Sequence, residues 1–82
     1  MTPAALREIV DALDALGLVL VCANLDHRTG ISVLAADAQG RAVAICWDAH
    51  HGWTVAASDS GDELSGPELL PILRREIARW SA

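Results

Sequence analysis

Three short polar connectors divide the middle of the chain, and they constrain its fold more than any other feature. They read DHRTG, DAQG and DAHHG, so each begins with aspartate and ends with glycine. Aspartate can accept hydrogen bonds from the backbone N–H groups that follow it, and glycine adopts the positive φ that closes a tight loop. The runs between the connectors are short, apolar and suited to strands. The pattern therefore predicts three β-hairpins in series, which make a four-stranded antiparallel meander.

Pairing the strands outward from each connector tests whether the three hairpins agree with one another. A register error of one residue would move the apolar side chains of a strand to the opposite face of the sheet. Instead, the three registers place one continuous apolar set on a single face. The predicted pairs are Leu25–Ile31, Ala23–Val33, Val21–Ala35, Asp37–Arg41, Ala35–Val43, Val33–Ile45, Ile31–Trp47, Trp47–Trp53 and Ile45–Val55.

A helix is predicted before the meander, at residues 3–16. Thr2 suits the N-cap, and Pro3 suits the first helical position because its missing N–H is not needed there. Apolar residues then recur at helical spacing, with charged residues on the other side. Gly17 suits a left-handed C-cap, which ends the helix.

A second helix is expected at about residues 67–80, after a polar segment predicted as a loop. Its start fits either a capping box from Ser65 or a start at Pro67, and Pro71 either falls in the first turn or delays the regular helix. The whole chain, residues 1–82, then forms a single two-layer α+β domain of order αββββα. Two helices about 10 Å wide match a sheet about 19 Å across, so both are expected on one face.

The second face of the predicted sheet is left without a cover. It carries mostly small apolar residues and no charge along its middle, whereas the water-facing side of an antiparallel sheet is normally polar. Exposed apolar surfaces usually mark association, although one helix on each face of the sheet would also cover it. The residues expected there are Leu18, Leu20, Cys22, Ser32, Leu34, Ala36, Ala42, Ala44, Cys46, Thr54 and Ala56.

We therefore predict a homodimer or a docked protein partner on this face, with edge-to-edge pairing of the first strand as a second route to a dimer. Cys22 and Cys46 would lie two strands apart, about 9.5 Å, so both are expected as free thiols. Replacing Ala44 with glutamate or arginine is expected to give a monomer. The residues predicted at the interface are Leu20, Cys22, Leu34, Ala36, Ala44 and Cys46.

The third connector comes nearest to a chemical motif. Trp47 and Trp53 flank it as a cross-strand pair, and His50 and His51 lie at its tip, so these four residues are the candidates for ligand contact. Histidine is suited to general-base catalysis, but the sequence offers no nucleophile for it. His50 and His51 are adjacent, and even together with His27 they do not have the spacing of ligands in a zinc site. The acidic run at residues 59–63 does not have the spacing of carboxylates in a calcium-binding loop. The favoured interpretation is an aromatic pair beside a solvated loop, with no catalytic residue and no metal.

Charge and composition exclude several functional classes. The net charge is −5 and all six basic residues are arginine, so the chain lacks the basic surface that nucleic-acid binding requires. No apolar run reaches the ~18 residues of a membrane span and the N-terminus lacks a secretion signal, so a cytoplasmic location is expected. No glycine-rich phosphate loop occurs, and no cofactor is predicted.

The Trp-Asp-x-x-His-Gly-Trp hairpin at residues 47–53 resembles one in small uncharacterised proteins of GC-rich bacteria, which implies no known activity. The αββββα order is similar to secretion-chaperone-like domains, which are small, acidic, dimeric and non-enzymatic; that likeness is one of architecture. We predict a small acidic interaction or regulatory module that acts as a homodimer. The alternatives are a small-molecule-binding or enzymatic domain built on the Trp/His hairpin, and a structural component of a larger assembly.

Overall fold

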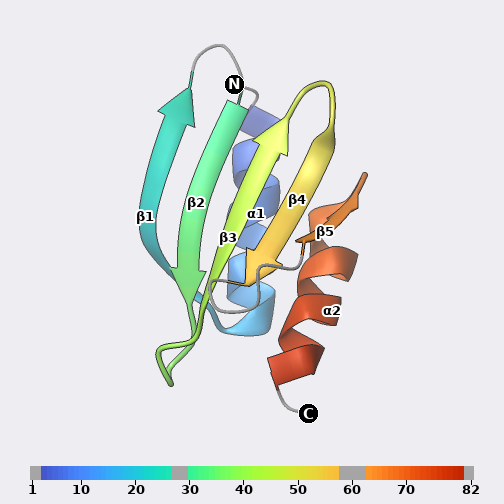
Figure 1. Cartoon of the computed structure of the whole chain (residues 1–82). Coiled ribbons are helices and arrows are strands. Elements are labelled where there is room, and N and C mark those ends of the chain that lie inside the picture. Colours follow the sequence, from blue (N-terminus) through green and yellow to red (C-terminus); the bar gives the residue numbers. More distant parts are fainter. Residues whose placement is uncertain (1–2, 27–29, 58–62, 81–82) are drawn as a thin grey trace.

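The structure, a computed structural model, describes residues 3–26, 30–57 and 63–80 (Figure 1). One antiparallel sheet and two helices form its two layers, which confirms the predicted α+β class. In Figure 1 α1 lies behind the sheet, whereas α2 lies beside it, next to β5. The elements in chain order are α1 (Pro3–Leu16), β1 (Val19–Asp26), β2 (Gly30–Ala36), β3 (Ala42–Asp48), β4 (Gly52–Ala57), β5 (Glu63–Gly66) and α2 (Leu69–Trp80).

The sheet has five strands in the order β1-β2-β3-β4-β5, so the predicted four-stranded meander is wrong by one strand. The added strand, β5, comes from the polar segment that the sequence predicts as a loop. It pairs antiparallel with β4, where Leu64 lies opposite Val55 and packs against the core. A four-residue strand has too short a pattern for periodicity to reveal, and its conformation depends on the neighbouring strand.

The registers predicted for β2–β3 and β3–β4 are confirmed pair by pair. The β1–β2 register is also as predicted at the loop end of the hairpin, but a β-bulge between Leu20 and Cys22 changes it further along. Because of the bulge Leu20, rather than the predicted Val21, is the Cα partner of Ala35. An extra residue in one strand is a local feature that strict alternation does not reveal.

The aspartate side chains act as predicted in the two hairpin loops that the structure describes in full. Asp37 Oδ1 accepts the backbone N–H groups two and four residues further on, both at 2.9 Å. Asp48 Oδ1 accepts the N–H two residues further on at 2.6 Å. Gly40 and Gly52 close these loops with φ angles of 85° and 76°. Residues 27–29 of the first connector lie outside the described residues.

The end of α1 shows why Leu18 does not lie on the second face of the sheet, where the sequence predicts it. Gly17 has a φ of 70°, and its N–H donates to the carbonyl of Asp14 at 3.3 Å. The N–H of Leu18 donates to the carbonyl of Leu13 at 2.9 Å. These two bonds make a Schellman motif, which brings the residue after the glycine against the last helical turn. Leu18 is therefore buried in the core.

The start of α2 depends on a residue from the other end of the chain. The helix begins at Leu69, later than the predicted start at residue 67, and the N–H of Leu69 donates to Glu8 Oε2 of α1 at 2.8 Å. Pro71 then falls in the first turn, where its missing N–H costs no helical hydrogen bond. The acceptor at this helix start is thus supplied by tertiary structure and not by the capping box from Ser65.

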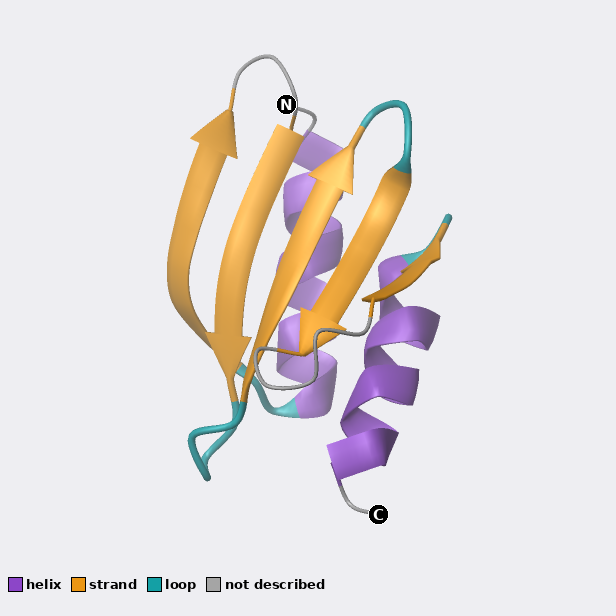
Figure 2. Cartoon of the chain, viewed as in Figure 1, coloured by secondary structure: helices purple, strands orange, loops and turns teal. Residues whose placement is uncertain are grey.

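The hydrophobic core lies between the helices and one face of the sheet (Figure 2). α2 packs against β4 and β5, while α1 packs against α2 and near β1. The opposite face of the same strands is the surface that remains available for function. The core cluster consists of Ala5, Ile9, Ala12, Leu13, Leu18, Ile31, Val33, Ala35, Val43, Ile45, Trp53, Val55, Leu69, Ile72 and Leu73.

Candidate functional site on the open face of the sheet

One face of the sheet has no helix over it, and we call this surface the open face. Figure 2 looks onto it, with α1 on the far side and α2 beside the sheet, next to β5. The Cα pairing aligns its residues in rows across the strands, and each of them is half-buried or exposed. The open face consists of Val19, Cys22, Asn24, Ser32, Leu34, Ala36, Ala42, Ala44, Cys46, Thr54, Ala56, Glu63 and Ser65.

The structure brings together most of the residues predicted at an interface. Those on the open face are Cys22, Leu34, Ala36, Ala44 and Cys46. The exception is Leu20, because the bulge pairs it with Ala35, which is fully buried under the helices. Cross-strand partners share a face, so Leu20 belongs to the helix side of β1, where it is half exposed.

The polar groups of the open face lie mainly in one row across the five strands, which consists of Asn24, Ser32, Cys46, Thr54 and Ser65. Ser32 Oγ and Cys46 Sγ are hydrogen-bonded at 3.6 Å. Both cysteines of the chain are free thiols, as predicted, and both are exposed. A shallow cavity of 260 Å³ lies beside Cys46 and is also lined by Asn24 and Asp48. Ligand pockets usually measure about 300–1,000 Å³, so this hollow is too small to indicate a small-molecule site.

The tryptophan pair of the β3–β4 hairpin belongs to the helix side of the sheet. Trp47 and Trp53 are Cα partners, with ring centroids 6.3 Å apart and ring planes inclined by 55°. Trp53 is buried in the core, and Trp47 packs against the margin of the core. Tilted aromatic pairs at this separation stabilise a sheet. These two candidates for ligand contact therefore have a structural role.

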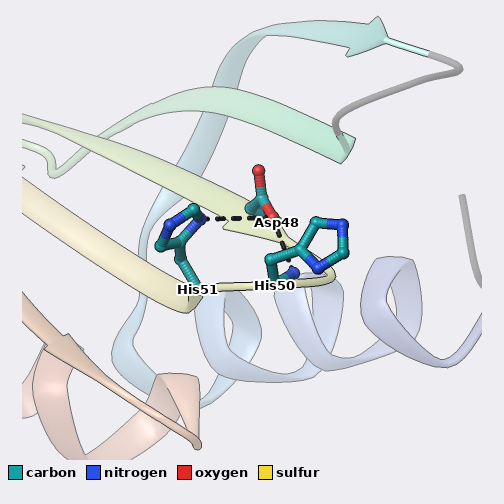
Figure 3. A network of polar contacts seen from close by, with 3 residues as sticks. All are labelled: Asp48, His50 and His51. Atoms are coloured by element: carbon teal, nitrogen blue, oxygen red, sulfur yellow. Dashed lines mark hydrogen bonds and ion pairs between the residues drawn. The ribbon is translucent and has the colours of Figure 1, made fainter.

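The two histidines lie at the exposed tip of the same hairpin, on either side of Asp48 (Figure 3). Asp48 Oδ1 accepts the backbone N–H of His50 at 2.6 Å and lies 3.4 Å from Nδ1 of His51. The backbone N–H of His50 lowers the pKa of Asp48 from its ordinary 3.8; partial desolvation opposes this, and His51 adds to it. The network stabilises the turn, and it does not bring the histidines together with Trp53.

No group of three potential metal ligands gathers among the residues that the structure describes. His27 and most of the acidic run at residues 59–63 lie outside those residues, and Glu63 begins β5. Within the described ranges, both helices are too short and too polar to cross a bilayer.

Two glutamates make specific contacts that the sequence patterns do not reveal. Glu8 supplies the acceptor at the start of α2, as described above. Glu76 is 1% exposed and pairs with Arg79, whose Nη1 lies 3.1 Å from Glu76 Oε2. A buried carboxylate requires such a partner. The position of Glu76 on the apolar side of α2, three residues after Leu73 and three before Arg79, is the signal that could have identified it.

Comparison with protein-family models, with curated proteins and with solved structures finds no match to this chain. The resemblance of the Trp/His hairpin to small bacterial proteins and the architectural likeness to secretion-chaperone-like domains therefore stay predictions.

Proposed function

We propose that the chain is a small acidic protein-interaction module without catalytic activity, which acts as a homodimer in the cytoplasm and docks a protein partner on the open face. The observation that supports this is the apolar part of the open face, which no described element covers and which consists of Leu34, Ala36, Ala42, Ala44 and Ala56. The water-facing side of an antiparallel sheet is normally polar. Here a polar row crosses the open face, but the part beside it is apolar, and an exposed apolar area favours contact with another molecule.

The side chains of the open face indicate the shape of the partner. Ala36, Ala42, Ala44 and Ala56 give it a nearly flat floor across three strands. A neighbouring row, in which Cys46 pairs with both Ser32 and Thr54, adds hydroxyl and thiol groups that can orient a partner. The expected partner surface is flat and apolar, as another sheet face would be.

Site-specific photo-cross-linking in the source cells tests this proposal. A benzoylphenylalanine at Ala44, inside the open face, is expected to give a discrete covalent adduct on irradiation. The same residue at Ala78, which is exposed on α2, serves as the matched control and is expected to give none. The mass of the adduct identifies a second copy or another protein, and either supports docking on the open face.

A second substitution shows whether the adduct depends on the open face. Ala56 of β4 is the Cα partner of Ala44 and also of Glu63, so Ala56→Glu places a second carboxylate beside Glu63 and the cross-linker. This change is expected to abolish the adduct, because docking would have to bury an unpaired negative charge. A folded protein that gives no adduct from Ala44, or an adduct unaffected by Ala56→Glu, would contradict the proposal.

A further inference from the structure

The strongly exposed large hydrophobic side chains of the described residues all belong to two neighbouring elements. On β1 they are Val19 (66% exposed), Leu20 (50%) and Val21 (58%), and on α1 they are Leu6 (38%) and Val10 (57%). β1 is an edge strand at the margin of the sheet farthest from α2 (Figure 1). An edge strand also presents unpaired backbone N–H and C=O groups. This margin thus combines exposed apolar side chains with free backbone hydrogen-bonding groups.

The exposed residues of α1 lie on the flank that faces this margin. The opposite flank of the helix, which includes Glu8 and Ala12, lines a cavity shared with Leu70 of α2. With 3.6 residues per turn, Leu6 and Val10 lie on the flank away from that cavity and therefore away from α2. Helix and strand expose apolar residues toward the same side of the molecule.

We infer that β1 pairs antiparallel with β1 of a second copy, so that the homodimer contains one continuous sheet with five strands from each copy. This inference rests on the homodimer of the proposed function and names the contact that forms it. The contact uses the edge of the sheet, so the open face of each copy stays available for a partner.

The charge of the chain favours a second copy as the occupant of this edge. Two copies that each carry a net charge of −5 repel one another, so they can associate only where charges are absent. From Val19 to Leu25, β1 contains no charged residue. It also contains no lysine and no proline, which commonly protect edge strands. A two-fold axis would place these uncharged strands against each other.

The faces of the sheet restrict the register of the pairing. Cys22 pairs with Leu34 of the open face, whereas Ala23 pairs with Val33 of the core. Antiparallel partners share a face, so Cys22 can lie opposite its own copy but not opposite Ala23. Centring the two-fold axis at Cys22 places Val21 opposite Ala23 and extends the second strand alongside Val19–Val21, while the bulge between Leu20 and Cys22 interrupts the alternation of faces beyond Val21.

The size of the edge predicts a reversible dimer. Eight residues at about 3.3 Å each make an edge ~26 Å long, with side chains above and below it. Such a contact buries less than the ~800 Å² per partner of a standard interface. We therefore expect the fraction of dimer to depend on protein concentration in light scattering and sedimentation equilibrium.

The two cysteines report which surface forms the dimer. Cys46→Ser leaves Cys22 as the single thiol, and Cys22→Ser leaves Cys46; both thiols are exposed and available to maleimides. In the edge dimer the two Cys22 residues face each other, whereas the two Cys46 residues are five strand spacings, ~24 Å, apart. Bismaleimidoethane is expected to cross-link Cys46→Ser into a covalent dimer, increasingly with concentration, and not to cross-link Cys22→Ser. The reverse result, or no dimer from either variant, would overturn the inference.

Charge at the edge provides an independent test. Leu20→Lys combined with Val21→Lys places lysines at exposed positions, so the fold is retained, and circular dichroism verifies this. In a symmetric contact both copies contribute these lysines, so the positive charges of the two copies repel one another. The dissociation constant of the dimer is therefore expected to rise at least tenfold. Ser65→Lys, at an exposed position of the opposite edge strand, is the matched control and should leave it unchanged. Equal dissociation constants for all three proteins would refute the β1 contact.

The outcomes separate this inference from the proposed function. A wild-type chain that is monomeric at all concentrations removes both the homodimer and the β1 contact. A dimer that cross-links through Cys46 and dissociates on Ala44→Arg keeps the homodimer and removes the β1 contact. A dimer that cross-links through Cys22 and survives Ala44→Arg supports the inference.

Discussion

The two edges of the sheet differ in the properties that decide whether an edge strand can pair with another chain. β1 has eight residues and exposes Val19, Leu20 and Val21. β5 has four residues, exposes Glu63, and is followed directly by Pro67. Short length, a charged side chain and a nearby proline all oppose pairing at an edge. The chain protects its β5 edge in these ways, whereas the described part of the β1 edge has only the bulge between Leu20 and Cys22.

The helical layer reinforces the difference. α2 packs against both β4 and β5, so the β5 margin is supported from behind. At the other margin Leu20 and Ala23, which are Cα partners of the core residues Ala35 and Val33, are exposed, so α1 does not cover the helix side of β1. The comparison indicates that the β5 margin is completed within one chain, whereas the β1 margin is suited to association.

The largest effect is expected where the start of β2, which follows the β1–β2 connection, lies against β3. Gly30, at the start of β2, has a φ of 135°, and a Cβ atom there would overlap the backbone carbonyl oxygen of Trp47. Gly30→Ala should therefore lower the free energy of unfolding by at least about 3 kcal/mol, measured by urea denaturation. Gly66→Ala in β5 is the matched change, because its Cβ would meet only the Ile72 side chain, at 3.3 Å. A cost below about 1 kcal/mol is expected there; equal losses would contradict this contrast.

A smaller effect is expected where α2 is held behind β5. Glu8→Ala removes the carboxylate that accepts the N–H of Leu69, so α2 should lose about 1 kcal/mol of stabilisation, as on loss of an N-cap. Glu8→Gln keeps an acceptor and should lose less. Hydrogen exchange should become faster in α2 and β5 and stay unchanged in β1. Glu68→Ala, at an exposed position nearby, is the control; faster exchange in β1 would show that the two margins are not independent.

The smallest effect concerns the turn between the two margins. The N–H of His50 and, more weakly, the His51 side chain lower the pKa of Asp48 below 3.8, so the carboxylate stabilises the fold above that value. This stabilisation is lost as the pH falls through the lowered pKa in the folded state. The difference in urea midpoint between wild type and Asp48→Asn should therefore be present at neutral pH and disappear in acid. A difference that does not change with pH would contradict the role of the charge.

The three central strands could be predicted from the sequence because their information is local. Asp37 and Asp48 bond to backbone groups within four residues, and strict alternation then sets the faces of β2, β3 and β4. The assignments of Leu18 and Leu20 failed because a Schellman turn and a β-bulge each shift the phase of a pattern. Both segments stay apolar whether or not the turn or the bulge is present. The pattern of apolar residues therefore does not reveal either feature.

Loop chemistry and side-chain alternation act over a few residues, so the α+β class, the central registers and the apolar part of the open face could be predicted from the sequence. Tertiary structure alone decided that residues 63–66 pair with β4, that Glu8 reaches the start of α2, and that α1 leaves β1 uncovered. Each of these depends on groups far apart in the chain. Their meeting depends on how the layers pack, which no local pattern encodes.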